Sequence, residues 1–522
     1  MIRRQKAATL FLCILLLLPA SIVAAGGSPL RSGNKTALLA PAQPAAPQPS
    51  VDPAEEEARK QLKGAVDVAA AWVNRPELQR SYVGVEIMDV PSGRIIFSHN
   101  GNRRFVSASI AKVLTTACAY DTFGGGYLFR TALVGYGEIR GNRLTGPLVI
   151  VPSQDPTFTL ADLRNMLSSL QGRVKTIEGS VMVGSVTGGG DHFSTEWLIQ
   201  DWGQDWMPAS SDLVVDRNIV TGTDPSHGLP VVAAGAAEQK DALFRTLLQS
   251  YWAPAWVTYN KESNNVTVWR PDQPVTGGLC VGNPTDFNAG VARQLLKSSG
   301  IKVEGHEVAP SNEQILFAEH HSDPISGIIR YCLAKSDNLY AQQFLRLLGT
   351  QQPINKAMGE MTLEERGLAK LNGWLLSIGG RQGDAVMFDG CGLSRKNAIS
   401  PHALNVVLRH MCGPTGDGPY IDLMKHEGEG SAKTFRFKTG AMDSVRSITG
   451  IVKTSTGQPM AVTAIVNDHT PQIGELRVSL NALISQLQSL GSVKLKPLSP
   501  PVHAPGAHAP TTTWAHHRRR HR

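Results

Sequence analysis

The chain has 522 residues, of which 42% are hydrophobic and 18% are charged. This composition supplies enough apolar material for a large packed core, so it excludes a disordered protein and a membrane protein with many spans. The formal net charge is +8, but most of the excess lies in two short segments, residues 3–6 and 518–522. A nucleic-acid-binding protein spreads lysine and arginine over one face of its fold, so we discard nucleic acid as the main partner.

Both ends of the chain have patterns typical of segments outside a folded core. Residues 1–25 have the pattern of a secretory signal peptide, with a basic start, an apolar run and a small-residue cleavage site. We therefore expect a periplasmic or exported protein, with an uncleaved anchor as the alternative. Residues 26–53 predict a flexible tether rich in Ala and Pro. Residues 493–522 predict a disordered tail rich in Pro, His and Arg, which either contacts an anionic wall or membrane surface or is a solvated extension.

Helices and strands follow one another in the first part of the body. Helical periodicity predicts a helix over residues 55–73, and alternating apolar residues at 82–89 and 94–97 predict a hairpin. A further helix is predicted from Ser109. Residues 54–143 are therefore assigned to the first part of a domain.

The pattern changes in the middle of the chain. Residues 144–308 contain short β-rich runs separated by Gly and Pro, with one helix expected near 288–299. We interpret this stretch as an inserted, mostly β region.

The second part of the interrupted domain is assigned to residues 309–492. Helices are expected at 324–348 and 363–378, strands at 434–438, 446–453 and 459–466, and a closing helix at 473–490. The fold class predicted is α+β, with a mainly antiparallel sheet covered by helices.

The first chemical motif is Ser109-Ile110-Ala111-Lys112. On a helix this spacing places the serine and the lysine one turn apart on one face, where the lysine can activate the hydroxyl as a nucleophile. The pattern also occurs at Ser32 and Ser299, but only Ser109 lies at the junction of a hairpin and a helix. At that junction the helix N-terminus stabilises developing negative charge.

Two further motifs follow along the chain. Ser336-Asp337-Asn338 comes after an apolar helical stretch and places a hydroxyl and a carboxamide two residues apart. Lys438-Thr439-Gly440 is expected at the end of a strand, where the lysine and threonine can hold a carboxylate. Each motif alone is weak, but their order, each in a suitable structural context, indicates a serine acyl-transfer site.

The three motifs resemble those of the penicillin-recognising serine enzymes. Within them the chain is similar to peptidase family S13, the D-Ala-D-Ala carboxypeptidases and endopeptidases of the penicillin-binding protein 4 and DacB type. The long stretch between Lys112 and Ser336 matches the large insertion of that family, as do segments such as Asp216-Arg217-Asn218 and 389–395. The likeness covers roughly residues 60–490.

The resemblance implies an acyl-serine mechanism on peptidoglycan peptides. Ser109 would attack the peptide carbonyl with Lys112 as general base, and Ser336 would pass a proton to the leaving amine. Asn338 would orient Lys112 and the substrate amide. A β-lactam would form the same acyl-serine and leave slowly.

The strand motif would bind the substrate. Lys438 and Thr439 would hold the terminal carboxylate, and Gly440 would let the ligand approach the backbone. The backbone N–H groups of Ser109 and Ala441 would form the oxyanion hole. We expect neither a cofactor nor a metal site.

Three positions depart from the pattern of the family. Ala441 stands where a Thr or Ser is usual, Cys391 replaces a common Ser, and Gly184 stands where an aspartate often binds the amine of a diamino acid. The resemblance therefore leaves the third residue of the stem peptide open.

The leading hypothesis is a serine-type D-Ala-D-Ala carboxypeptidase or endopeptidase that is inhibited by β-lactams. A β-lactamase or esterase on the same scaffold is the first alternative. A catalytically weak wall-binding protein is the second, although recognition alone does not require Ser109, Lys112, Ser336, Asn338 and Lys438 together.

Overall fold

The fold is described from a computed structural model of the whole chain. The described residues all belong to the compact unit Asp52–Arg522. They are 53–186, 190–191, 193–198, 201, 204–220, 231–233, 256–269, 278–308, 311–352, 361–427, 434–469 and 473–491. The predicted signal peptide, nearly all of the tether and the tail beyond Gly491 lie outside them.

A six-stranded antiparallel sheet forms the centre of the catalytic part, in the order β19-β20-β21-β22-β1-β2. Its strands come from both ends of the chain. β1 (Tyr82–Asp89) and β2 (Ile95–His99) form the predicted hairpin, while β19 (Lys425–Glu427), β20 (Phe435–Met442), β21 (Val445–Lys453) and β22 (Pro459–Asn467) close the sheet. β22 pairs with β1 along the whole length of β1, and all residues of the two strands except Tyr82 are buried.

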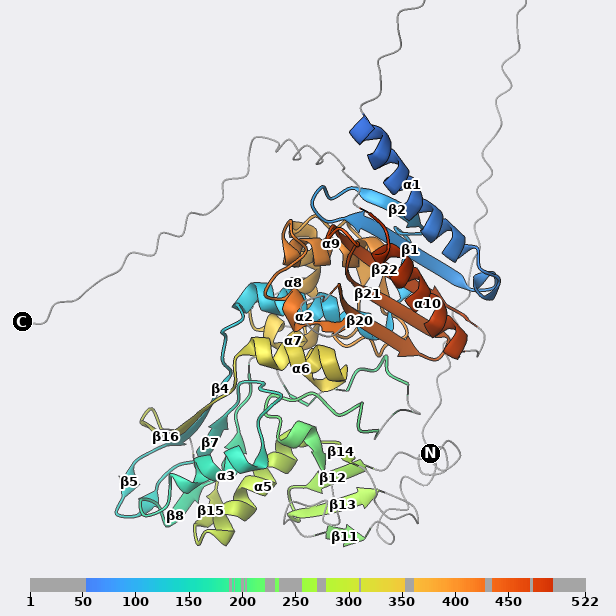
Figure 1. Ribbon diagram of the computed structural model, residues 1–522. Helices are drawn as coiled ribbons and strands as arrows, with labels where there is room; N and C mark the ends of the chain where they lie inside the picture. The colour runs from blue at the N-terminus through green and yellow to red at the C-terminus, as the bar shows by residue number, and fades with distance from the viewer. Residues whose placement is uncertain are drawn as a thin grey trace, which may run out of the picture. The chain divides into compact units, whose positions relative to one another are not determined.

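Helices cover both faces of this sheet (Figure 1). On one face, α1 (Pro53–Val73) and α10 (Ile473–Gln488) pack against the strands through one apolar cluster, and the Trp72 indole N–H donates to the Ser479 carbonyl at 2.9 Å. On the other face lie α2 (Ala111–Phe123), α6 (Ile325–Lys335), α7 (Asn338–Gly349), α8 (Leu363–Ser377) and α9 (Pro401–Cys412). This arrangement confirms the predicted α+β class.

The region between α2 and α6 carries its own sheets. One contains β16 (Gln314–His321), β4 (Arg130–Tyr136), β7 (Leu148–Val151) and β9 (Val181–Val183). A second contains β15 (Lys302–His306), β8 (Thr176–Gly179), β6 (Arg143–Leu144) and β5 (Ile139–Arg140). Helices α3 (Leu160–Ser168) and α5 (Pro284–Ser298) pack with these strands in a separate apolar cluster.

A third sheet in this region is built in the order β10-β14-β12-β13-β11. Its strands are β10 (Ile219–Val220), β14 (Leu279–Val281), β12 (Trp256–Asn260), β13 (Asn265–Trp269) and β11 (Val231–Ala233). The bounds predicted for the insertion, 144–308, stay a prediction. The pairing of β4 with β16 nevertheless extends one of these sheets beyond both of those bounds.

One expectation about an individual element was wrong. The strand that carries Lys438-Thr439-Gly440 does not end there, since β20 continues to Met442 by pairing with β21 through Val445. The helical region expected over 324–348 consists of α6 and α7, which are separated at Ser336 because its left-handed conformation (φ 60°, ψ 36°) cannot continue an α-helix.

Candidate active site

Ser109 and Lys112 lie at the start of α2. Ser109 is in a short 3₁₀ turn, Ala108–Ile110, and Lys112 is in the first turn of the helix. The turn begins at Ala108, which has a φ of 51° and lies two residues after the end of β3 (Phe105–Val106). The Lys112 Nζ lies 3.1 Å from the Ser109 Oγ, as the predicted spacing requires.

The Lys112 ammonium is fully buried and has three hydrogen-bond partners. Besides the Ser109 hydroxyl, it donates to the Asn338 Oδ1 at 2.6 Å and to the Cys391 carbonyl at 2.7 Å. A lysine ammonium has three donors, so these contacts fix its position completely. The structure thus joins Lys112 to residues more than 200 positions away in the chain.

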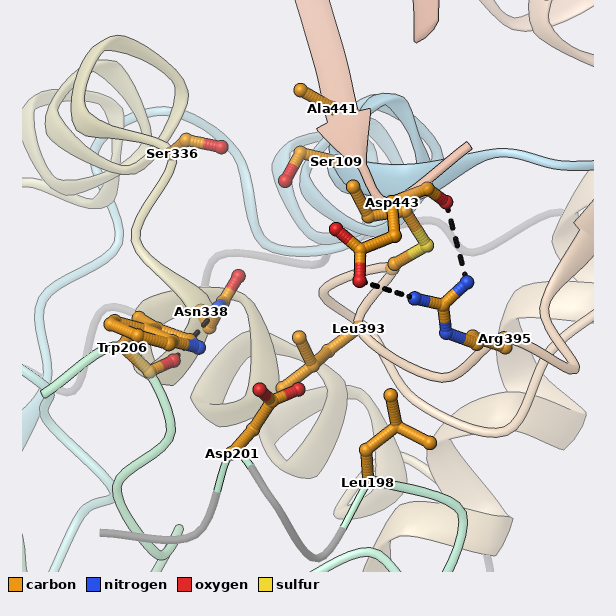
Figure 2. A pocket seen from close by; sticks show the side chains of 12 residues that line it. Ser109, Leu198, Asp201, Trp206, Ser336, Asn338, Leu393, Arg395, Ala441 and Asp443 are labelled. Atoms are coloured by element: carbon orange, nitrogen blue, oxygen red, sulfur yellow. Dashed lines mark hydrogen bonds and ion pairs between the residues drawn. The ribbon is translucent and has the colours of Figure 1, made fainter. Parts of the chain in front are cut away.

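Ser336 and Asn338 lie at the break between α6 and α7. Asp337 caps α7, since its side chain accepts a hydrogen bond from the Tyr340 N–H at 3.1 Å. The left-handed Ser336 and the cap together turn the two flanking side chains into the cavity, where Ser336, Asn338 and Ser109 all lie (Figure 2).

Lys438 projects from β20 and is buried. Its Nζ donates to the Ser336 Oγ at 3.0 Å and to the Thr439 carbonyl at 2.7 Å. Burial, and next the positive charge of Lys112, lower the pKa of Lys438 to about 7. This lysine therefore changes its charge near neutral pH while it contacts Ser336.

Gly440 allows β20 to lie directly beside Ser109. A Cβ at this position would come 3.1 Å from the Ser109 N, 2.8 Å from the Ser107 carbonyl and 2.3 Å from the Ser447 Oγ. No side chain fits there without moving backbone. The close approach brings the exposed Ala441 to the same cavity as Ser109.

The buried Asp389 carboxylate holds the loop that supplies the third partner of Lys112. It accepts hydrogen bonds from the backbone N–H groups of Cys391, Gly392 and Ser394 at 3.0, 2.6 and 2.6 Å. The Trp197 indole N–H and the Asn397 side chain also donate to it, at 2.9 and 2.7 Å. Burial raises the pKa of the Cys391 thiol well above its usual range, so the thiol is not a second nucleophile.

These residues line a cavity of about 320 Å³ (Figure 2). Its walls combine the catalytic part with the inserted region, which contributes Leu198, Asp201 and Trp206. At one side Arg395 forms an ion pair with Asp443 at 3.2 Å. The cavity therefore presents both charges to a ligand, next to the reactive hydroxyl.

The structure brings together all eight residues predicted for the site. Ser109, Ser336, Asn338 and Ala441 line the cavity. Lys112 contacts Ser109, and Lys438 contacts Ser336. Thr439 and Gly440 lie between Lys438 and Ala441 on β20. Among the described residues no cluster has the composition of a metal site.

Sequence reasoning missed three contributions from the inserted region. The Trp206 carbonyl accepts a hydrogen bond from the Asn338 Nδ2 at 2.7 Å, and Arg217 forms an ion pair with Asp337 at 2.7 Å. Asp201 lines the cavity, whereas Gly184 is not among the described lining residues. The segment Asp216-Arg217-Asn218 was noticed in the sequence, but nothing in it indicates its partner.

Comparison with known proteins places the chain among penicillin-interacting peptidases. It is 22% identical over 423 residues to the D-alanyl-D-alanine carboxypeptidase DacB of Haemophilus influenzae, which covers 75% of this chain and 86% of that protein. It is 23% identical over 455 residues to a D-alanyl-D-alanine carboxypeptidase of Actinomadura sp., covering 77% and 80%. The crystal structure of penicillin binding protein 4 from H. influenzae has the same fold, with a TM-score of 0.62 at 20% identity over 81% of this chain and 98% of that one.

The family model for D-Ala-D-Ala carboxypeptidase 3 (S13) matches residues 64–485, which include all three motifs. The resemblance inferred from the motifs is thereby confirmed. The chain belongs to the D-Ala-D-Ala carboxypeptidase S13 family of serine peptidases.

Proposed function

We propose that Ser109 is the nucleophile of a D-Ala-D-Ala peptidase that cleaves peptidoglycan stem and cross-link peptides through an acyl-serine. The observation that carries this proposal is the pairing of each serine with a lysine at the cavity wall. Lys112 Nζ lies 3.1 Å from the Ser109 Oγ, and Lys438 Nζ lies 3.0 Å from the Ser336 Oγ.

Acylation would proceed from this geometry. Once its ammonium has lost one proton, Lys112 takes the proton of the Ser109 hydroxyl as the oxygen attacks the peptide carbonyl. The backbone N–H groups of Ser109 and Ala441 stabilise the oxyanion, and each such donor contributes about 3 kcal/mol to transition-state stabilisation. Asn338 keeps Lys112 in place through its 2.6 Å contact.

Release of the leaving group would use the second serine and lysine. Ser336 passes a proton to the amine that departs, and Lys438 replaces that proton through their 3.0 Å contact. Lys438 then regains a proton from solvent, while Lys112 releases to solvent the proton that it took from Ser109. Lys438 and Thr439 hold the carboxylate of the C-terminal D-alanine. Water then hydrolyses the acyl-serine and regenerates the enzyme.

The partners proposed are peptidoglycan peptides and β-lactams. A β-lactam would acylate Ser109 in the same way, because its strained amide presents a carbonyl and a carboxylate with similar spacing. We also propose export of the protein, on the basis of the signal pattern in residues 1–25. No described helix is long and apolar enough to span a membrane. Contact of the basic tail with an anionic surface remains a proposal from charge alone.

Intact mass spectrometry with a fluorescent penicillin tests the proposal. We expect a covalent adduct on the parent protein, no adduct on Ser109→Ala, and release of D-alanine from a pentapeptide by the parent only. Rapid turnover of penicillin without D-alanine release would instead indicate a β-lactamase. Absence of an adduct on folded parent protein would contradict catalysis through Ser109.

A further inference from the structure

The inserted region touches the active-site motif Ser336-Asp337-Asn338 at two of its three residues. The Trp206 carbonyl accepts from the Asn338 side chain at 2.7 Å, and the Arg217 guanidinium pairs with the Asp337 carboxylate at 2.7 Å. The motif lies between two helices of the catalytic part. The side chains of the motif therefore contact residues next to it in the chain, such as Tyr340, and also Trp206 and Arg217, which are more than 100 positions away.

Asp337 is a buried carboxylate with one partner for each oxygen. Its side chain is 3% exposed; Oδ1 accepts from the Tyr340 N–H and Oδ2 pairs with Arg217. A buried carboxylate without its cation is costly, and it rotates toward water or takes up a proton. Either response would move the backbone between Ser336 and Asn338, because Asp337 connects them.

Arg217 is itself held in an unusual backbone turn. Asp216, Arg217 and Asn218 have φ values of 46°, 61° and 54°, a left-handed run that residues other than glycine rarely adopt. The Asn218 side chain fixes the turn by donating to the Ala209 carbonyl at 2.8 Å and to the Ser211 Oγ at 2.9 Å. The Asp216 side chain accepts from the Leu160 N–H at 3.2 Å. Strained backbone of this kind persists where surrounding structure imposes it, commonly at functional sites.

We propose that Arg217 is a positioning residue for acylation, acting through Asp337 on Ser336 and Asn338. Its charge fixes Asp337, Asp337 fixes the backbone of the motif, and the Asn338 Oδ1 then meets Lys112 at 2.6 Å. The inserted region thus completes the active site. This inference rests on the acyl-serine mechanism proposed above.

The test separates positioning from folding and from binding. Arg217→Gln removes the charge but keeps an unbranched, polar side chain, shorter by two bonds, with a similar backbone preference. We expect the acylation rate constant for a fluorescent penicillin to fall by about 10- to 100-fold, the loss typical of a slightly misplaced catalytic group. Arg217→Lys keeps the charge without the planar fork and should recover part of the rate.

Noncovalent affinity and stability serve as parallel measurements. The dissociation constant of the penicillin before acylation should change by less than about twofold, since Arg217 does not line the cavity. Arg143→Gln is the matched control, because Arg143 is 42% exposed, against 37% for Arg217, and pairs at 2.8 Å with Glu178 and Glu304 within the inserted sheets. Its acylation rate should stay within about twofold of the parent.

A double variant tests the route of the effect. Asp337→Asn keeps the helix cap and removes the charge, so Arg217→Gln added to it should slow acylation little further. The proposal would be overturned if the fold decrease in acylation rate of the double variant equalled the product of the decreases of the two single variants. It would also be overturned if Arg217→Gln were acylated at a rate within about twofold of the parent. If Arg217→Gln does not fold, Arg217→Lys and Asp337→Asn make the same comparison. Failure of the acyl-serine mechanism would appear in the parent, as a missing adduct, and not only in these variants.

Discussion

Two buried lysines each contact one serine of the candidate site, and their surroundings differ. Lys112 contacts the carbonyl oxygens of Asn338 and Cys391, while Lys438 contacts the Ser336 hydroxyl and the Thr439 carbonyl. Because burial and the charge of Lys112 lower the pKa of Lys438 to about 7, its positive charge depends on pH in the working range.

This predicts pH-dependent binding of carboxylates. Above pH 7 an increasing fraction of Lys438 is neutral, so a penicillin carboxylate loses its cation and binding weakens as pH rises through about 7. The measurement is the dissociation constant of a penicillin for Ser109→Ala, which cannot be acylated, between pH 6 and 9. Ser109→Ala combined with Lys438→Arg should bind with a flat profile, because a guanidinium stays protonated. A profile equally flat with Lys438 present would contradict the assignment.

The grouping of the candidate site residues was predictable from the sequence because short motifs carry them. Ser109 with Lys112, and Ser336 with Asn338, are close in the chain, so spacing and local context were sufficient. Asp389 was expected to shape a loop beside the cleft, and its hydrogen bonds to the N–H groups of Cys391, Gly392 and Ser394 agree with that expectation. The role of Arg217 was not predictable. Arg217 meets its partner 120 positions away through the packing of the inserted region, and no local pattern indicates such a contact.

At the level of single elements, Gly440 determines how close β20 comes to Ser109. Gly440→Ala would place a Cβ within 3.1 Å of the Ser109 N and 2.8 Å of the Ser107 carbonyl, so the strand has to move away. We expect acylation by penicillin to fall by about 100-fold or more, since a shift of this size displaces the Ala441 N–H from the oxyanion.

The melting temperature of each variant shows whether a loss of acylation arises from displacement of β20 or from unfolding. Gly457→Ala is a suitable control because Gly457 lies in the β21–β22 turn with open space around it, although its φ of 86° introduces some strain. Its melting temperature should fall while its acylation rate stays near that of the parent. An active Gly440→Ala enzyme would show that the strand adapts without loss.

The helices and strands with strong periodicity were predicted well, but one strand end and one helix were not. The hairpin of β1 and β2 and the helices α1, α8 and α10 lie close to their predicted bounds. The end of the strand that carries Lys438-Thr439-Gly440 was placed too early, because the pairing of β20 with β21 continues to Met442. Helix α9 was also missed, although Ser400 caps it and Pro401 begins it, which is a usual signal for a helix start.

At the scale of the whole molecule, one buried charge network joins the inserted region to the catalytic helices. Arg346 of α7 is 1% exposed and pairs with Asp212 at 2.6 Å and with Glu364 of α8. Removal of the arginine would leave two buried carboxylates without their cation. We expect Arg346→Met to reduce the free energy of unfolding by about 3–5 kcal/mol.

Calorimetric unfolding, or urea titration followed by fluorescence, measures this loss. Lys63→Met is the control, because the exposed Lys63–Asp67 pair on α1 should contribute at most about 0.5 kcal/mol. Equal stability of the two variants would mean that the buried network is replaceable by apolar packing. The contact between Arg346 and Asp212 was not predictable from the sequence, since it joins residues 134 positions apart.

The strand order of the central sheet also determines when, during synthesis of the chain, the active site can assemble. β22 lies between β1 and β21, so the strands made first cannot complete their pairing until residues 459–467 have been synthesised. A ribosome-bound chain therefore carries Ser109 and Lys112 well before Lys438 and Gly440 exist beside them. Ser109 therefore becomes reactive only when synthesis has passed residue 467. In a chain that ends before β22 we expect the Ser109 hydroxyl to be unreactive, because β20 and β21 cannot join the sheet beside it.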